Sequence, residues 1–199
     1  MPNGHRIVLM PARIDPRKDQ ETMLRAFAAL RESLPDVSLV IAGRRTDSNY
    51  AAKISRLLDK GGLGADVVIA ERISDSEMEV LYQESALTVM CSLQEGLGLA
   101  AVEAMSWGSP VVTTDVDGLR EVVHHEENGL LVPPRNPSAL AGAILRLMTD
   151  SELMAKVRAN ARQTVRDKFD EEMMVSKTLK VYHDVIARQN HASGVGAGS

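Results

Sequence analysis

Two carboxylates flank a glycine-rich stretch in the middle of the chain, EGLGLAAVE at residues 95–103. If a helix begins near Gly98, the free backbone N–H groups of residues 97–100 form an anion site, which glycine opens to close approach. Glu95 and Glu103 would repel a phosphate in that site, but they could accept hydrogen bonds from neutral hydroxyls. The stretch therefore predicts a ligand that carries hydroxyl groups on both sides of a diphosphate, as a nucleotide sugar does.

Cations that could neutralise such a diphosphate follow the first apolar run, in the segment ARIDPRK at residues 12–18. Arg13 could bind a phosphate bidentately, and Lys18 could act as a point charge. Arg17 and Lys18 also stand just before an expected helix N-terminus, where the helix dipole disfavours cations. A bound anion would remove this conflict, so the segment strengthens the prediction of a diphosphate site.

The glycines also fit a second signature, the dinucleotide-binding turn of an NAD oxidoreductase. Gly96, Gly98 and Ala101 satisfy G-x-G-x-x-A, and Asp115 lies about 20 residues on, where such a motif places a ribose ligand. In that motif the first glycine directly follows its strand, whereas residues 92–95 intervene here. An acid also occupies the place where the pyrophosphate would arrive. We therefore favour the paired carboxylates.

The elements that must position these residues are read from an alternation of short β-branched runs and amphipathic segments. This alternation is typical of βαβ units, and it predicts an α/β fold with a doubly wound, mainly parallel six-stranded sheet. In such a sheet, ligands bind outside the carboxyl ends of the strands. The predicted strands occupy residues 6–12, 37–42, 66–70, 86–91, 110–114 and 129–133.

Helices are predicted between and after these strands. Apolar residues at helical spacing indicate one helix over residues 23–34 and another that ends at Gly62. Ser74 and Glu77 form a capping box, in which hydroxyl and carboxylate satisfy free backbone N–H groups. Extra C-terminal helices are expected to cover the sheet at residues 137–148, 151–169 and 170–189.

Composition excludes several classes of protein. A chain of 199 residues with 44% apolar and 25% charged residues suits one globular domain. A net charge of −4 and 3% aromatic residues disfavour nucleic-acid binding. No window approaches the ~20 apolar residues that span a bilayer, so no transmembrane segment is predicted. The single cysteine, Cys91, cannot form an internal disulfide, and we expect a cytoplasmic location.

Other potentially reactive residues are assigned structural roles. Residues 124–127, HHEE, are interpreted as a polar loop rather than a metal site, because no second ligand cluster accompanies them. Cys91 ends an apolar run and is expected to be packed and inert. Asp115 and Asp117 are interpreted as turn residues. No metal is predicted.

Together the motifs resemble the C-terminal, donor-binding domain of GT-B fold glycosyltransferases of the retaining family 4 type. The resemblance covers residues 6 to about 186 and rests on ARIDPRK, SLQEGLGLAAVEAMSWGSPVVTTDVDGLREVV and ENGLLVPPRNPSALAGAI in that order. It implies that the sheet is the Rossmann-like half of a GT-B fold. Residues 1–188 would form the donor-binding domain, and residues 189–199 a disordered or cloning-derived tail.

The resemblance also implies a role for each candidate residue. Arg13 and Lys18 would bind the diphosphate, and Glu103 the ribose hydroxyls. Glu95 would complete the catalytic set by binding the hydroxyls of the transferred sugar. The implied reaction transfers a hexosyl group from a UDP-, GDP- or ADP-linked sugar with retention of configuration and without a metal or other cofactor. The backbone amides expected nearby are those of Leu97, Gly98 and Leu99.

The chain departs from the family pattern near the expected base site. Gly43-Arg44-Arg45 lacks a second glycine, and Glu71-Arg72 replaces a glycine-containing pair, so neither base nor sugar is predicted. In this family the acceptor binds to an N-terminal domain of similar size, which is absent here. We expect a donor-binding part of a larger enzyme that is inactive without that domain. The alternative is a stand-alone, non-catalytic module that binds a nucleotide or nucleotide sugar.

Overall fold

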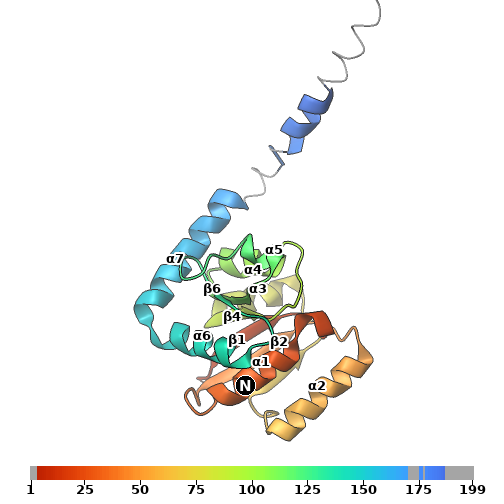
Figure 1. Ribbon diagram of the computed structural model, residues 1–199, viewed down its shortest axis with the longest axis vertical. Helices are drawn as coiled ribbons and strands as arrows, with labels where there is room; N and C mark the ends of the chain where they lie inside the picture. Colours follow the sequence, from red (N-terminus) through yellow and green to blue (C-terminus); the bar gives the residue numbers. More distant parts are fainter. Residues whose placement is uncertain (1–3, 170–174, 177, 187–199) are drawn as a thin grey trace, which may run out of the picture.

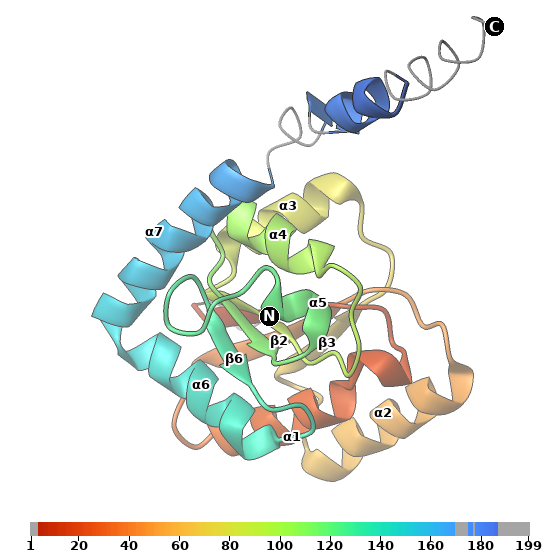
Figure 2. The same ribbon diagram turned by 45° about the horizontal axis from the view of Figure 1, so that its top comes forward.

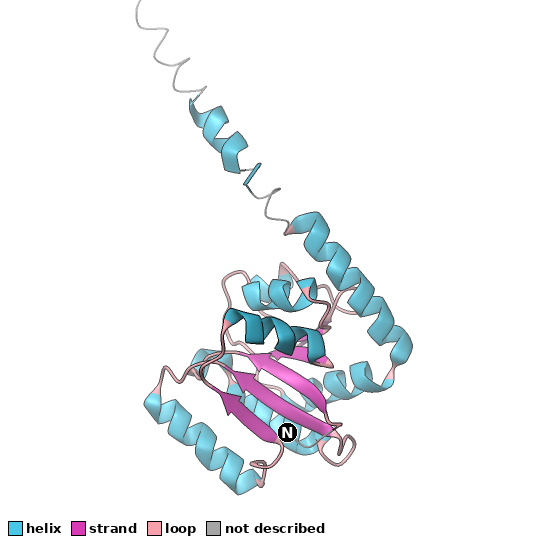
Figure 3. Cartoon of the chain, turned by 180° about the vertical axis from the view of Figure 1, so that it is seen from behind, coloured by secondary structure: helices cyan, strands magenta, loops and turns pink. Residues whose placement is uncertain are grey.

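Six parallel strands form a single sheet at the centre of the molecule (Figure 1). The computed structural model describes residues 4–169, 175–176 and 178–186. Every strand pairing is parallel, which confirms the predicted α/β fold. Figure 3 shows the sheet from behind. The strands are β1 (Arg6–Pro11), β2 (Val37–Ala42), β3 (Val67–Ala70), β4 (Leu87–Met90), β5 (Val111–Thr114) and β6 (Leu130–Val132).

The strand order is β3-β2-β1-β4-β5-β6, so β1 and β4 are neighbours in the middle of the sheet. From β1 the chain moves outward through β2 and β3, and from β4 it moves outward through β5 and β6 in the opposite direction. After the loops at the carboxyl ends of β1 and β4, the chain therefore continues to opposite faces of the sheet, to α1 (Gln20–Leu30) and to α4 (Leu99–Ser106). Sheets of this kind bind ligands in the crevice at that switch point.

Helices cover both faces of the sheet (Figure 2). α1, α2 and α6 lie on one side, and α3 and α4 lie on the other. α7 follows α6 and packs against both α6 and α4, so it connects the two layers. The helices are α1 (Gln20–Leu30), α2 (Ser48–Gly61), α3 (Asp75–Glu84), α4 (Leu99–Ser106), α5 (Asp117–Arg120), α6 (Pro137–Thr149) and α7 (Ser151–Lys168), with a 3-10 turn, η1, at Pro16–Lys18.

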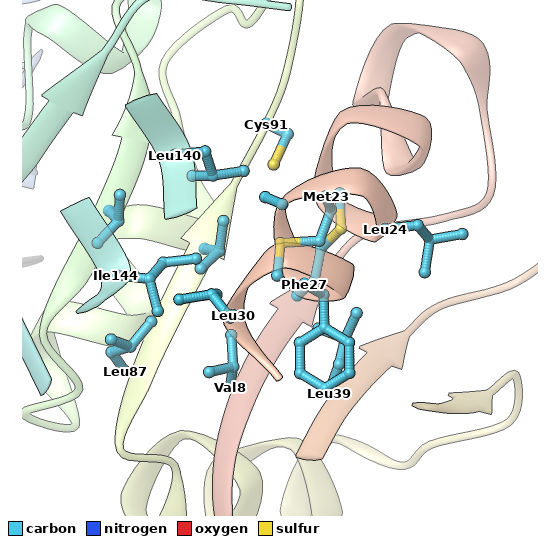
Figure 4. Packing of buried hydrophobic residues seen from close by; sticks show 14 of the residues in the cluster. Val8, Met23, Leu24, Phe27, Leu30, Leu39, Leu87, Cys91, Leu140 and Ile144 are labelled. Carbon is cyan, nitrogen blue, oxygen red and sulfur yellow. The ribbon is translucent and has the colours of Figure 1, made fainter. Parts of the chain in front are cut away.

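Two apolar cores follow from the alternation of side chains along each strand. On β1, Val8 belongs to the core beneath α1 and α6, whereas Leu9 belongs to the core beneath α3 and α4. The first core contains Phe27 and Leu30 of α1 and Ile144 of α6, which lie over the sheet (Figure 4). Cys91 is fully buried in the same core, as predicted, and desolvation raises the pKa of its thiol.

The predicted element boundaries need two corrections. α1 ends at Leu30 rather than at residue 34, and residues 31–33 form a turn, after which the Leu34 N–H donates to the Leu30 carbonyl at 2.8 Å. Asp117 is not a turn residue but begins the short helix α5. The capping box of Ser74 and Glu77 is confirmed.

The C-terminal predictions are partly tested. α6 and α7 occupy the first two of the predicted segments. In the third, residues 175–176 and 178–186 are helical. Residues 170–174, 177 and 187–189, and the predicted tail at 189–199, lie outside the described residues. Among the helices that the structure describes, none combines the length and the apolar character needed to span a bilayer.

Candidate functional site

The loops that follow β1 and β4 meet at the switch point of the sheet. The β1 loop contains η1, and the β4 loop comprises residues 91–98. The backbone N–H of Leu93 donates to the carbonyl of Arg17 at 2.8 Å. Lys18 Nζ donates to Glu95 Oε2 at 2.5 Å, which joins residues 77 positions apart. The two loops thus form one cross-linked unit.

A pocket of about 280 Å³ opens in this unit. Three of its lining residues are cations and one is a carboxylate, so its net charge favours an anionic ligand. The structure therefore brings together Arg13, Lys18 and Glu95, three of the residues singled out in the sequence. The lining residues are Arg13, Arg17, Lys18, Gln94, Glu95 and Gly96.

Glu95 is held by both sides of the crevice. Its Oε2 atom accepts hydrogen bonds from Lys18 Nζ and from Ser92 Oγ, the latter at 2.8 Å. The backbone carbonyl of Ser92 in turn accepts a 2.6 Å bond from Thr114 Oγ1 of β5. Within the described residues Oε1 has no partner, so one oxygen is fixed and the other can bind a hydroxyl.

Carboxylates of the chain itself neutralise the two cations that precede the helix N-terminus. Arg17 donates two hydrogen bonds to Asp15 at 3.0 Å each, and these bonds lower the pKa of Asp15 to about 2. Lys18 is paired with Glu95. The position of these cations is therefore no evidence for a bound anion by itself. Arg13 is half-exposed, and its side chain makes no hydrogen bond to the described residues. Its nearest carboxylate oxygen, on Asp15, is 3.7 Å away, so Arg13 is the least tightly paired of the three cations.

A buried glutamine, which the sequence analysis missed, fixes the backbone of Arg13. Gln20 is the first residue of α1 and is fully buried. Its Nε2 atom donates to the carbonyl of Arg13 at 2.8 Å, and its Oε1 atom has no hydrogen-bond partner among the residues described. Ile14 N–H donates to the Arg44 carbonyl at 2.8 Å. The loop is thus anchored to α1 and to the loop after β2.

The start of α4 has the free N–H groups expected of an anion site. Gly98 is the N-cap residue at φ 71°, a left-handed conformation that favours glycine, and none of the described side chains caps the helix. In the described part of the chain, the N–H groups of residues 97–100 have no hydrogen-bond partner. A Cβ atom at Gly118 of α5 would lie 2.3 Å from the Gly96 carbonyl oxygen. Gly118 therefore lets α5 pack directly against the loop.

Glu103 stands apart from the other candidates. It lies on α4 and does not line the pocket, and its Oε2 atom accepts a 3.1 Å hydrogen bond from the hydroxyl of Tyr82 on α3. Over the residues that the structure describes, no cation pairs with Glu103. Leu97 and Leu99, between the two carboxylates, expose their side chains. The structure thus places Glu103 beyond the anion site, on the side of α3.

The dinucleotide interpretation does not fit this geometry. Residues 91–98 separate β4 from α4, so no glycine turns directly off the strand. Asp115, which would have to bind a ribose, accepts a 2.5 Å hydrogen bond from Arg120 Nε. That bond lowers the pKa of Asp115 and directs its carboxylate toward α5. Both features needed for NAD are therefore absent from this region.

Comparison with known proteins gives one family match and several similar proteins. Residues 1–164 match the family described as Glycosyl transferases group 1. The chain is 32% identical over 206 residues to D-inositol 3-phosphate glycosyltransferase of Thermobispora bispora, covering 100% of this chain and 48% of that protein. Sucrose-phosphate synthase of Thermosynechococcus elongatus superposes with a TM-score of 0.85 at 33% identity, over 94% of this chain and 47% of its own.

A further similar structure contains a ligand. The Anabaena protein HepE, solved in complex with UDP and glucose, superposes with a TM-score of 0.82 at 26% identity. The superposition covers 89% of this chain and 49% of the HepE chain. The chain therefore spans about half of the length of each of these three proteins.

Proposed function

The chain belongs to the group 1 glycosyl transferases, and on that basis we propose that it is the donor-binding half of a retaining glycosyltransferase. The complete enzyme would transfer a hexosyl group from a nucleoside-diphosphate sugar to an acceptor. The acceptor would bind to an N-terminal domain, and the present chain would be inactive without it. This division agrees with the half-length match to the relatives. The cytoplasmic location stays a prediction.

The observation that carries this proposal is the cross-linked pair of loops at the switch point. Lys18 and Glu95 join the loops after β1 and β4, and Arg13 lines the same pocket. Cations at the edge and free N–H groups at the start of α4 supply what a diphosphate needs. UDP in the Anabaena relative supports a ligand of this class.

The positions of the carboxylates suggest how the rest of the ligand lies. The transferred sugar would place a hydroxyl on Oε1 of Glu95, and the ribose would place hydroxyls on Glu103. The base would then extend across the sheet toward the ends of β2 and β3. A hollow of about 720 Å³ lies there, lined by Arg44, Arg45, Glu71, Arg72, Ile73, Ser74 and Glu77.

In this arrangement Glu95 positions the sugar and is not the nucleophile, because attack by the acceptor on the face that the diphosphate leaves needs no covalent intermediate with the enzyme. The acceptor hydroxyl would attack the anomeric carbon on the face that the diphosphate leaves, and its proton would pass to a leaving-group oxygen. Arg13 and Lys18 would stabilise the charge that develops on the diphosphate. Because these cations neutralise that charge, we propose that no metal ion is needed.

Calorimetric titration with UDP, GDP, ADP and NAD, in buffer containing EDTA, tests the proposal. We expect saturable, single-site binding of one nucleoside diphosphate. The Glu103→Gln variant should bind the same nucleotide more weakly. Binding of NAD alone would contradict the proposal, and so would a requirement for a divalent metal or the absence of binding to all three diphosphates.

A further inference from the structure

Tyr82 of α3 is a buried aromatic residue whose hydroxyl meets a single partner in the described part of the chain. The hydroxyl donates to Glu103 Oε2 at 3.1 Å. Only 3% of the residue is exposed. Tyr82 belongs to the core beneath α3 and α4, together with Leu9 of β1 and Met90 of β4. The ring is therefore fixed by packing, and its hydroxyl is presented at a defined position.

The direction of this hydrogen bond is set by the surroundings of the phenol. Burial, and then the adjacent charge of Glu103, raise the pKa of Tyr82, so the hydroxyl keeps its proton and acts as a donor. Glu103 cannot donate when it is ionised. The bond therefore occupies Oε2, while Oε1 has no partner within the described residues.

Glu103 depends on this bond more than Glu95 depends on any single contact. Glu95 is held by a lysine and a serine from two loops. Glu103 has no ion pair in the part of the chain that the structure describes, and Tyr82 is the one side chain there that bonds its carboxylate. A glutamate on a helix surface samples several rotamers, and ordering it costs entropy. A fixed donor would reduce that cost before a ligand binds.

We propose that Tyr82 is a positioning residue, which holds Glu103 ready for the hydroxyls of a ribose and thereby sets a preference for ribonucleotides over 2′-deoxyribonucleotides. The proposal rests on the function proposed above, in which Glu103 binds the ribose. With Oε2 tethered, Oε1 and the remaining lone pair of Oε2 can accept the two ribose hydroxyls. Loss of the tether leaves the carboxylate free to turn toward solvent.

The test uses Tyr82→Phe, which removes the hydroxyl and keeps the ring. The whole chain is titrated with whichever of UDP, GDP or ADP binds most tightly, and with its 2′-deoxy counterpart. Tyr82→Phe should lower the ratio of ribonucleotide to deoxyribonucleotide affinity on the order of threefold to tenfold, the range for one hydrogen bond. Affinity for the deoxyribonucleotide, which keeps one of the two hydroxyls, should fall less than affinity for the ribonucleotide.

The matched control is Tyr50→Phe. The Tyr50 hydroxyl accepts a 3.3 Å bond from Glu21 N–H at the start of α1, away from Glu103, so its removal should leave the affinity ratio unchanged. Thermal unfolding of both variants reports any loss of fold. In a double variant, Tyr82→Phe combined with Glu103→Gln should give the same ratio as Glu103→Gln alone, because Tyr82 acts through Glu103.

The outcomes separate the two proposals. If Glu103→Gln removes the ribose preference but Tyr82→Phe keeps it, the positioning role of Tyr82 is overturned and the ribose role of Glu103 stands. If the two changes add independently in the double variant, Tyr82 acts on the ratio without Glu103, and its positioning role is overturned as well. If Glu103→Gln leaves the preference intact, or the unmodified chain binds none of the three diphosphates, the proposed function fails and the role of Tyr82 fails with it.

Discussion

Both ends of β4 carry clusters of polar residues, but the clusters differ in charge and burial. At the amino end, Ser109 Oγ lies 3.0 Å from Ser85 Oγ and 2.8 Å from Thr88 Oγ1, and all three residues are buried. At the carboxyl end, the Lys18 and Glu95 side chains are 22% and 23% exposed and line a pocket. One cluster is neutral and closed, and the other is charged and open.

This difference distinguishes a cluster that stabilises the fold from one that binds a ligand. Hydroxyls that satisfy one another inside the protein remove the cost of burying polar groups. A partly exposed ion pair contributes little to stability, with a typical value of about 0–1 kcal/mol. Substitutions at the amino end should therefore change the free energy of unfolding, whereas substitutions at the carboxyl end should change affinity.

Arg13→Ala should have the largest effect at the carboxyl end. It should weaken binding of a nucleoside diphosphate by roughly 1.5–3 kcal/mol, the range for hydrogen bonds to charged groups. Because Arg13 is half-exposed, the free energy of unfolding should stay within ~0.5 kcal/mol. Calorimetry and urea unfolding measure the two quantities. Arg25→Ala, an exposed arginine on α1, is the control, and equal affinities for both variants would reject the role of Arg13.

Gly118→Ala tests whether α5 supports the carboxyl-end loop. The added Cβ would lie 2.3 Å and 2.4 Å from the carbonyl oxygens of Gly96 and Glu95, so the loop backbone must move. We expect about 1–3 kcal/mol of destabilisation together with weaker nucleotide binding. Gly142→Ala, on the exposed side of α6 with open space around it, should instead stabilise by about 0.4–1 kcal/mol. Wild-type stability and affinity in Gly118→Ala would show that the contact is unimportant.

Ser109→Ala, at the amino end, should change the free energy of unfolding and leave nucleotide affinity unchanged, the reverse of Arg13→Ala. It leaves the buried Thr88 hydroxyl without its partner, which should cost about 1–2 kcal/mol in the free energy of unfolding. Nucleotide affinity should equal that of the unmodified chain. Ser138→Ala, at an exposed position in the first turn of α6, serves as the control. A weaker affinity in Ser109→Ala would mean that the two ends of β4 are coupled.

Asp15 should give the smallest effect, and one that depends on pH. Its pKa is lowered from 3.8 to about 2 by hydrogen bonds from Arg17, so its ionised form stabilises the folded chain above about pH 4. That contribution is lost as the pH falls toward 2. Because Arg17 is exposed, we expect less than ~1 kcal/mol. Urea midpoints of Asp15→Asn and the unmodified chain should differ at pH 6 and converge near pH 2, and a constant difference would contradict this origin.

The sequence predicts the elements better than the contacts between them. The β-branched run at residues 37–42 coincides with β2, and the glycine at 62 caps α2, because these signals are local. α5 was missed because Asp117-Gly118 has the composition of a turn. The Lys18 and Glu95 pair spans 77 residues, and only the strand order brings the two together.

The supporting residues of the site could not be predicted for a related reason. Gln20 and Tyr82 have residue types that are common in helices, and their importance comes from buried hydrogen bonds to Arg13 and Glu103. No spacing in the sequence indicates those partners. Arg17 and Lys18 were noticed because cations are unusual just before a helix N-terminus, although Asp15 and Glu95 compensate that charge within the chain.

The most direct measurement of the central claim is the change in backbone amide NMR shifts when the chain is titrated with the nucleoside diphosphate that it binds. We predict saturable shifts at the carboxyl end of β4 and along the ligand path, at Lys18, Glu95, Leu99 and Glu103. The amides of Ser85, Thr88 and Ser109 at the amino end should stay in place. Shifts concentrated elsewhere on the chain, with none at the loops after β1 and β4, would contradict the assignment of this crevice as the donor site.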